Sequence, residues 1–285
     1  MKVLFIYNPV AGHRNIKGKV KYVVKHLAPY YDKFDVVASL SPNHFRQTIY
    51  QASTRYDLLI VSGGDGTINM AINIIARLEH RPVLGFIPLG TINDAVKNFG
   101  NPTRFKKAVN LIKDSYVKDV DIIKVNNRYV SYVSCCGAFS DIPYSTSVRM
   151  KKIFGRLSYY FKAIPRFFKK QEVHGYIIAN DKRKMFRSNF LLILNGSMMG
   201  GFKINKGAPN DDGYVDILFT NPGIFNSVFK YFFRKKSITR IRAKSGSIMV
   251  NSNVIWDFDG EVGSKGRLNF EVLPKHLSIL TVKED

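Results

Sequence analysis

Apolar and polar positions follow two different patterns along the chain, and the first pattern fills the N-terminal part. Apolar runs at residues 3–7, 58–61 and 83–87 indicate strands, and the continuous run 58–61 is typical of a strand buried inside a parallel sheet. Residues 34–38 indicate a further strand. The segments between these runs carry apolar residues three or four positions apart, which is the spacing of one helix face. This regular alternation of strand and helix predicts a parallel α/β sheet with right-handed crossovers.

The pattern changes near residue 120, where short β-rich segments separated by turn residues replace the helical spacing. These segments predict an antiparallel β-sandwich that carries one or two helical insertions. A length of 285 residues suits two domains, and 45% hydrophobic with 23% charged residues is typical of a folded protein. The predicted strands of the second half cover residues 122–125, 129–134, 176–179, 190–194, 215–219, 247–250 and 268–272.

The sequence carries few targeting or redox signals. No run approaches the roughly 18 consecutive apolar residues that a membrane helix needs. The apolar core at residues 3–7 is too short for a secretion signal. Cys135 and Cys136 are adjacent, which favours small residues in a buried strand over a disulfide or a metal site. We therefore expect a cytoplasmic protein.

A net charge of +23 restricts the partners to nucleic acid, anionic lipid or phosphorylated substrates. Two basic segments rich in aromatic residues, 149–170 and 229–244, carry many of these cations. Each could be a solvated helix, or it could dock on an anionic membrane with its cations at the headgroups. The sequence shows no helix-turn-helix, RNP or OB signature, so we favour membrane docking over nucleic-acid binding.

The strongest chemical motif directly follows the apolar run 58–61. Ligands of open α/β sheets bind at the carboxyl ends of strands, where glycine lets backbone amides approach phosphate oxygens. A purely structural turn is the alternative, but this ungapped sequence favours phosphate binding. The motif consists of Gly63, Gly64, Asp65, Gly66 and Thr67.

A second motif follows the next apolar run and therefore reaches the same edge of the sheet; it contains Gly90, Thr91, Asn93 and Asp94. The carboxylates of Asp65 and Asp94 could cap helices. They could also bind Mg²⁺, which takes oxygen ligands and keeps several waters. The sequence contains no Walker A motif, no dinucleotide fingerprint after the first strand and no protein-kinase signature.

These motifs resemble those of the lipid kinases of the diacylglycerol kinase superfamily, in particular the soluble bacterial enzymes. The resemblance extends over almost the whole chain, and further segments match in the same order. They are Asn8-Pro9 with Gly12, the interdomain strand Val120–Ile122, a Lys/Gly/Tyr helix at 152–162, the acidic turn Asp211–Tyr214 and the Asp-Gly-Glu of 259–261.

The resemblance implies an NAD-kinase/diacylglycerol-kinase-like fold with ATP bound between two domains. Residues 1–120 would form a three-layer α/β nucleotide-binding domain, completed by the last strand at 275–285. Residues 121–274 would form a β-sandwich domain for the lipid, with a basic amphipathic helix at 149–170. The implied reaction is ATP- and Mg²⁺-dependent phosphorylation of a lipid hydroxyl, with diacylglycerol as the first candidate and phosphatidic acid as its product. Peripheral association with the inner face of the membrane and a homodimer are expected as well.

The resemblance also implies a role for each candidate residue. Asp259 would be the base that takes the proton of the lipid hydroxyl, and Glu261 would orient the site or share in metal binding. Asp65 and Asp94 would organise Mg²⁺-ATP, and Asp212 would anchor a structural Mg²⁺ site. Nucleotide binding would involve Asn8, Pro9, Gly63, Gly64, Asp65, Gly66, Thr67, Gly90, Thr91, Asn93, Asp94 and Lys162.

Two other functions stay open. NAD kinases share the first glycine motif, although the second motif, residues 259–261 and the basic segments speak against them. A regulator could bind lipid or nucleic acid on the same scaffold without catalysis, and bound nucleotide without phosphorylated product would indicate it. The chain also departs from the family pattern after Asp94, where Ala95, Val96 and Lys97 replace a Phe, a small residue and an Arg.

Overall fold

The computed structural model describes residues 1–11, 15–90, 92–114, 116–137, 172–220 and 238–283. The chain divides into two compact units. Two strands, β5 (Tyr116–Val125) and β18 (Leu268–Thr281), contribute to both. Unit 1 comprises Met1–Ile122, Met198–Lys206 and Pro274–Asp285, and unit 2 comprises Ile123–Ser197 and Gly207–Leu273.

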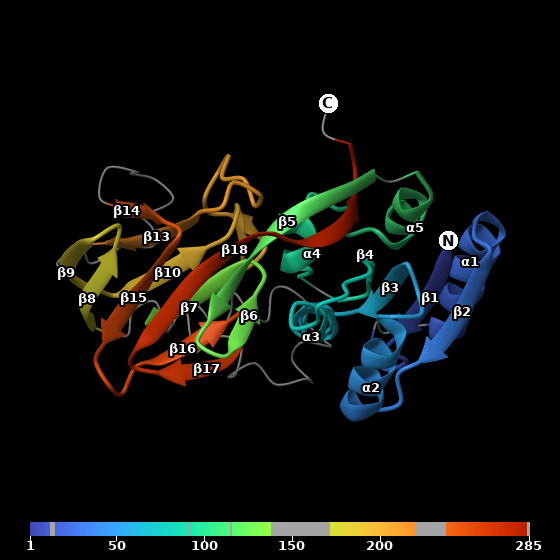
Figure 1. Cartoon of the computed structure of the whole chain (residues 1–285), viewed down its shortest axis with the longest axis horizontal. Coiled ribbons are helices and arrows are strands. Elements are labelled where there is room, and N and C mark those ends of the chain that lie inside the picture. The colour runs from blue at the N-terminus through green and yellow to red at the C-terminus, as the bar shows by residue number, and fades with distance from the viewer. Residues whose placement is uncertain (12–14, 91, 115, 138–171, 221–237, 284–285) are drawn as a thin grey trace. The chain divides into compact units, whose positions relative to one another are not determined.

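Unit 1 is built on a parallel sheet with the strand order β2-β1-β3-β4-β18 (Figure 1). All six residues of β3 are buried, as expected of a strand that is covered on both faces. The predicted parallel α/β sheet is therefore confirmed. The strands are β1 (Lys2–Tyr7), β2 (Lys33–Ala38), β3 (Leu58–Gly63) and β4 (Val83–Pro88). Unit 1 also contains the separate short pair β11 (Met198–Met199) and β12 (Phe202–Lys203).

Helices cover both faces of this sheet, so the predicted three layers are present (Figure 1). Leu27 of α1 and Val109 of α5 share one core cluster with Phe5 and Ile60 of the sheet. Helices α2 and α3 contact each other and bury their own apolar residues, among them Ile49. The helices are α1 (Ile16–Leu27) followed by the 3₁₀ turn η1 (Ala28–Tyr30), α2 (Pro42–Ala52), α3 (Asp65–Ile75), α4 (Asp94–Asn98) and α5 (Phe105–Asp114).

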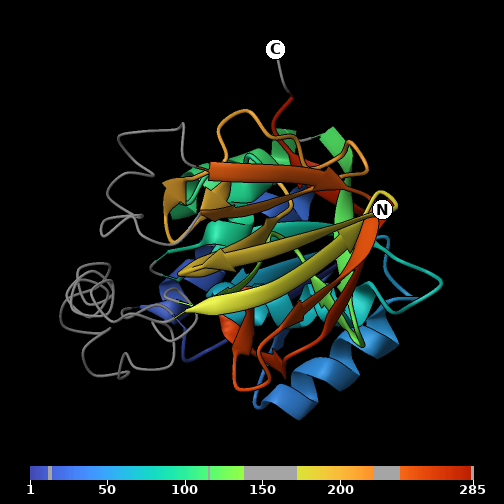
Figure 2. The same cartoon turned by 90° about the vertical axis from the view of Figure 1, so that its left-hand side faces the viewer.

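Unit 2 contains two antiparallel sheets, whose strands run from green to red in Figure 2. In one sheet, β15, β8 and β9 follow the first part of β18, while β6 pairs with β5; the other has the order β14-β13-β10-β7-β16-β17. Side chains of both sheets, such as Ile177 and Trp256, share one core, which is the packing expected of a sandwich. The strands are β6 (Arg128–Val130), β7 (Val133–Gly137), β8 (Val173–Ala179), β9 (Lys182–Ser188), β10 (Phe190–Leu194), β13 (Val215–Thr220), β14 (Ile238–Ala243), β15 (Ser245–Val250), β16 (Ile255–Phe258) and β17 (Glu261–Lys265).

Three segments differ from the sequence-based prediction. The predicted strand 129–134 is interrupted at Ser131 and Tyr132, which lie between β6 and β7. The charged strand β9 was not predicted, because it lacks apolar alternation. Strand β18 is continuous across Pro274, where two separate strands were predicted. Within the described ranges, no helix has the length and apolar character that crossing a membrane requires.

Candidate functional site

The glycine-rich motif after β3 packs tightly against the start of α3. A Cβ on Gly63 would lie 2.5 Å from the Cβ of Thr67, so a larger residue would push this turn apart. Asn8, which follows β1, donates from its backbone N–H to the carbonyl of Ser62 at 2.9 Å. Its side-chain Nδ2 donates to Thr67 Oγ1 at 3.3 Å. The structure therefore brings Asn8 and Thr67 together at the carboxyl edge of the sheet.

The second glycine motif lies directly against the first. A Cβ on Gly90 would lie 2.9 Å from the Cα of Gly64 and 2.6 Å from Asn93 Oδ1. Glycine at position 90 thus lets the two loops approach at backbone distance. The loops form one surface at the edge of the sheet, which is the arrangement that suits phosphate groups.

Gly90→Ala is expected to lower the free energy of unfolding by about 1–3 kcal/mol, the usual cost of overpacking a tight contact. The added methyl group has no space between Asn93 Oδ1 and the Gly64 backbone. Urea unfolding of the purified variant measures the effect. Gly66→Ala is the matched control, because a Cβ there meets no atom within 4 Å. Equal stability of the two variants would contradict the packing argument.

Asp65 joins the two loops through its carboxylate. Its Oδ2 accepts the backbone N–H of Asn93 and its Oδ1 accepts that of Asp94, both at 2.8 Å. Asn93 adopts a left-handed conformation with φ of 56°, which directs the chain into α4. Burial raises the pKa of Asp65, whereas these amides and Lys97 stabilise its ionised form. The Asp65 carboxylate therefore accepts two amides at the start of α4. The N-cap residues themselves are Gly64 for α3 and Asn93 for α4, so neither aspartate is the N-cap that the helix-cap alternative expected.

Asp94 is the most enclosed carboxylate of this edge, with 2% of its surface exposed. Its Oδ1 and Oδ2 accept the backbone N–H of Gly201 at 2.8 and 3.1 Å, and Lys97 Nζ lies 3.3 Å from Oδ1. Burial raises the pKa of Asp94, the nearby Asp65 charge raises it further, and Lys97 opposes both. The sequence marked Lys97 only as a departure from the family pattern, and Gly201 carried no signal at all.

Asp259 lies in unit 2, in the turn between β16 and β17. Asp259 and Gly260 both have positive φ, 52° and 87°, as the two central residues of a type I′ hairpin turn do. The carboxylate is 5% exposed and accepts hydrogen bonds from the segment Ser131–Val133. Burial raises the pKa of Asp259 to about 6, although these hydrogen bonds favour the ionised form. A carboxyl group with a pKa in this range can accept a proton near neutral pH.

The acidic turn at Asp212 does not fit a metal site. Asp212 Oδ1 accepts the backbone N–H of Tyr214 at 2.9 Å, and Oδ2 forms an ion pair with Arg242. The guanidinium of Arg242 also lies over the Tyr214 ring, 4.4 Å from its centroid. A cation already occupies the position that the sequence assigned to Mg²⁺ here.

Asp65 and Asp94 fit a metal–nucleotide complex better, because they offer carboxylate oxygens beside the glycine loops. Mg²⁺ is usually held by one or two carboxylates together with the phosphates of a nucleotide. The described parts of the chain contain no cluster of three or more His, Cys, Asp or Glu side chains that could hold a metal ion by themselves. Any Mg²⁺ at this edge would therefore need phosphate oxygens as further ligands.

The other predicted site residues are either outside the described residues or away from the contacts described above. Thr91, Lys162 and the basic segment 149–170 lie outside the described residues. Glu261 begins β17 with an exposed side chain, and Pro9 follows Asn8 at the end of β1.

The last part of the second basic segment forms strand β14, in which Arg240 binds Asp216 with two hydrogen bonds of 2.6 Å. A solvated helix was one of the two alternatives for this segment, and residues 238–243 form a strand instead.

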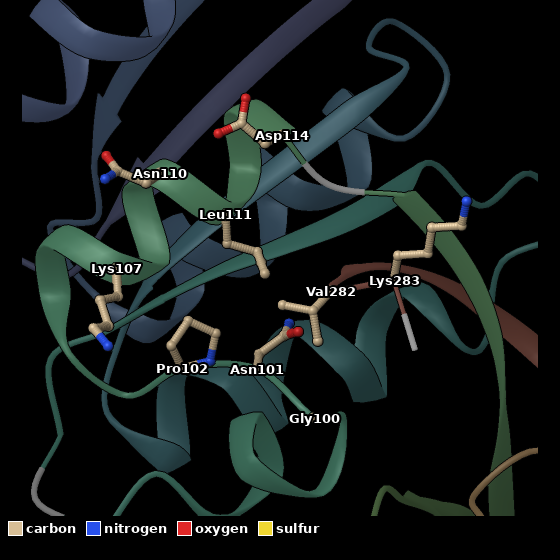
Figure 3. Close-up of a pocket in the computed structure, with 9 residues that line it drawn as sticks. All are labelled: Gly100, Asn101, Pro102, Lys107, Asn110, Leu111, Asp114, Val282 and Lys283. Atoms are coloured by element: carbon tan, nitrogen blue, oxygen red, sulfur yellow. The ribbon is translucent and has the colours of Figure 1, made fainter. Parts of the chain in front are cut away.

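A pocket of about 460 Å³ in unit 1 contains none of the predicted residues (Figure 3). One face of α5 lines it with Lys107, Leu111 and Asp114, opposite the segment that follows α4 and the end of β18. Asn101 lies in its wall, with Nδ2 bonded to the carbonyl of Leu280 at 2.8 Å. This pocket is thus separate from the glycine loops, and neither of the two sequence motifs indicated it.

Known proteins resemble the chain over most of its length. Residues 2–125 match the family described as the diacylglycerol kinase catalytic domain. The diacylglycerol kinase of Staphylococcus epidermidis is 34% identical over 242 residues, covering 81% of this chain and 76% of the relative. That of Staphylococcus saprophyticus is 31% identical over 301 residues, covering 97% and 94%. A crystal structure of a diacylglycerol kinase from Bacillus anthracis, 26% identical, matches 98% of this chain and 96% of its own with a TM-score of 0.85.

These findings define a phosphotransferase that acts on an alcohol group, which confirms the predicted class of enzyme and its fold. The chain belongs to the diacylglycerol kinase family, and its family identifies it as a lipid kinase. ATP is the co-substrate that membership of a kinase family implies.

Proposed function

We propose that this enzyme transfers the γ-phosphate of ATP to a lipid hydroxyl in a Mg²⁺-dependent reaction, and that diacylglycerol is the acceptor. The observation that carries the proposal is the pair of glycine loops joined by the Asp65 carboxylate, in a chain of this family. The amides of these loops would hold the phosphates. Phosphoryl transfer depends mainly on such positioning and on charge neutralisation.

The proposed roles follow from the environment of each side chain. Asp65 and Asp94 would bind Mg²⁺ together with the nucleotide, and the metal would neutralise charge on the phosphates. Lys97 would hold the carboxylate of Asp94 in place. Asp259 would accept the proton of the lipid hydroxyl, since burial gives it a pKa of about 6. No step of the mechanism uses a metal at Asp212.

Phosphate transfer from γ-labelled ATP into mixed micelles tests the proposal. Diacylglycerol, monoacylglycerol, phosphatidylglycerol and a sphingoid base are offered separately, with NAD as a parallel acceptor and with Mg²⁺ present or chelated. Label in diacylglycerol that requires Mg²⁺ is the expected result. Label in NAD would support the rival kinase, and bound ATP without transfer to any acceptor would support a regulator.

The pH dependence of kcat should follow Asp259. A base must be ionised, so kcat at saturating ATP should fall as the pH decreases through about 6. Stability should follow the opposite trend, because the folded pKa lies above the unfolded value of about 3.9. The contribution of Asp259 to the free energy of unfolding is present below about pH 4 and is lost as the pH rises through about 6. A kcat that stays constant down to pH 5 would contradict this role.

We also propose that the enzyme acts at an anionic membrane surface. The net charge of +23 and the exposed run Lys182–Lys184 of β9 support this, as does the neighbouring Met185, which is 67% exposed. Basic residues near such a surface each contribute about 1 kcal/mol to binding. Sedimentation with vesicles should show binding to phosphatidylglycerol-rich vesicles and little binding to pure phosphatidylcholine. Equal binding to both would contradict the proposal.

A further inference from the structure

The segment Ser131–Val133 encloses the carboxylate of Asp259. Asp259 Oδ2 accepts the backbone N–H of Ser131 at 2.6 Å and its Oγ–H at 2.8 Å. Oδ1 accepts the backbone N–H of Tyr132 at 3.1 Å and that of Val133 at 3.0 Å. A carboxylate has about four acceptor sites, so these four donors match them in number. The interruption between β6 and β7 is what makes these amides available.

One of the four donors differs in its chemistry. Backbone N–H groups only donate, and they favour the ionised form of Asp259 alone. The Ser131 hydroxyl can donate to the carboxylate and, after rotation of the O–H bond, accept from the carboxylic acid. Ser131 is fully buried, so bulk water has no access to replace this partner. Among these four donors, the hydroxyl is therefore the partner that suits both protonation states.

The backbone around Ser131 is held in place from β10. Asn195, which follows β10, donates from Nδ2 to the carbonyl of Ser131 at 3.0 Å and from its N–H to the carbonyl of Tyr132 at 2.9 Å. Asn195 is fully buried. Because both carbonyls are bound, the peptide groups are fixed while the hydroxyl keeps its rotation. This is the arrangement expected of a rigid base with one adjustable partner.

We propose that Ser131 is the positioning residue of the catalytic base, and that its hydroxyl changes from donor to acceptor when Asp259 takes the proton. The inference rests on the proposed function of Asp259. The lipid O–H bond breaks and a new O–H bond forms at Asp259 Oδ2. The electron pair left on the lipid oxygen forms the new bond to the γ-phosphorus, and ADP leaves with the electrons of the broken P–O bond. The Ser131 O–H rotates away and frees its acceptor site on Oδ2, and the protonated carboxyl group then donates a hydrogen bond to Ser131 Oγ.

Steady-state kinetics of Ser131→Ala test the proposal. The variant should lower kcat by about 10- to 100-fold, the effect of one hydrogen bond to a charged group, and leave KM for ATP within about twofold. Ser131→Thr retains a hydroxyl and should restore kcat to within about threefold. Ser131→Cys, a weak donor and acceptor, should give an intermediate kcat. A merely structural role would not produce this order of hydroxyl, thiol and methyl side chains.

Ser134→Ala is the matched control. Ser134 is equally buried in β7, and its Oγ has no hydrogen-bond partner among the described residues. It should keep kcat within about twofold of the wild type. The inference would be overturned if Ser131→Ala kept the full kcat, or if the alanine, cysteine and threonine variants lost equal amounts. The proposed function would still stand in either case, provided that the wild type phosphorylates the lipid. Absence of turnover by the wild type with every lipid would instead overturn the proposed function, and this inference with it.

Discussion

Asp259→Asn is expected to reduce kcat by about 10²- to 10⁴-fold, the range that general-base catalysis contributes. The carboxamide cannot take the proton of the lipid hydroxyl. Its NH₂ group would also face the donors of the segment Ser131–Val133, since only its oxygen can accept. The glycine loops belong to unit 1, so the affinity for ATP should be retained.

Label transfer into diacylglycerol micelles measures this loss, and calorimetric titration measures ATP binding. Glu271→Gln is the matched control, because Glu271 is an exposed acidic residue of β18 and should keep kcat within about twofold. An Asp259→Asn protein that folds and keeps more than about a tenth of the wild-type kcat would exclude Asp259 as the base.

Asp65→Ala should weaken both the fold of unit 1 and its affinity for ATP. The substitution leaves the backbone N–H groups of Asn93 and Asp94 without their carboxylate acceptor at the start of α4. Loss of a helix-capping carboxylate in a buried site predicts a decrease of about 1–3 kcal/mol in the free energy of unfolding. The second glycine loop then loses its connection to the first, so KM for ATP should rise at least about tenfold.

Urea unfolding and the KM for ATP measure the two effects of the Asp65 substitution. Asp65→Asn keeps one acceptor oxygen and should fall between the wild type and Asp65→Ala in both. Glu79→Ala, which removes an exposed carboxylate beyond the end of α3, is the control for a change in surface charge. Loss of ATP affinity without any loss of stability would show that Asp65 contacts the nucleotide complex and does not hold the loops.

The parallel sheet was predictable because strands buried on both faces leave a simple signal. Strand β3 appears in the sequence as the unbroken apolar run 58–61, followed by Ser62 and Gly63, and the structure confirms it. Strand β9 is different: five of its seven residues are exposed, so no apolar alternation marks it. Strand β18 contains Pro274, which suggested that a strand ends there. The strand nevertheless stays extended, because it pairs with β15 before Pro274 and with β4 after it.

The candidate site was predictable only as far as its motifs are local. The sequence indicated that Asp65 and Asp94 reach one edge of the sheet, and the structure places the Asp65 carboxylate on the amide of Asp94. It could not indicate the bond from Gly201 to Asp94, because the two residues are 107 positions apart. The partners of Asp259 were hidden for another reason. The apolar character of residues 129–134 predicts a continuous strand, whereas bonding to a distant carboxylate interrupts it.

Strand β18 has a consequence for how this protein is made. Ile279 pairs with Leu84 of β4, and Leu277, Ile279 and Leu280 are buried. The sheet that carries the glycine loops therefore stays incomplete until Ile279 has left the ribosome. During synthesis, the edge of β4 exposes unpaired backbone groups next to apolar side chains, a surface prone to association. Nascent chains of this enzyme should accordingly depend on chaperones until β18 has been synthesised, and chains truncated before β18 should aggregate.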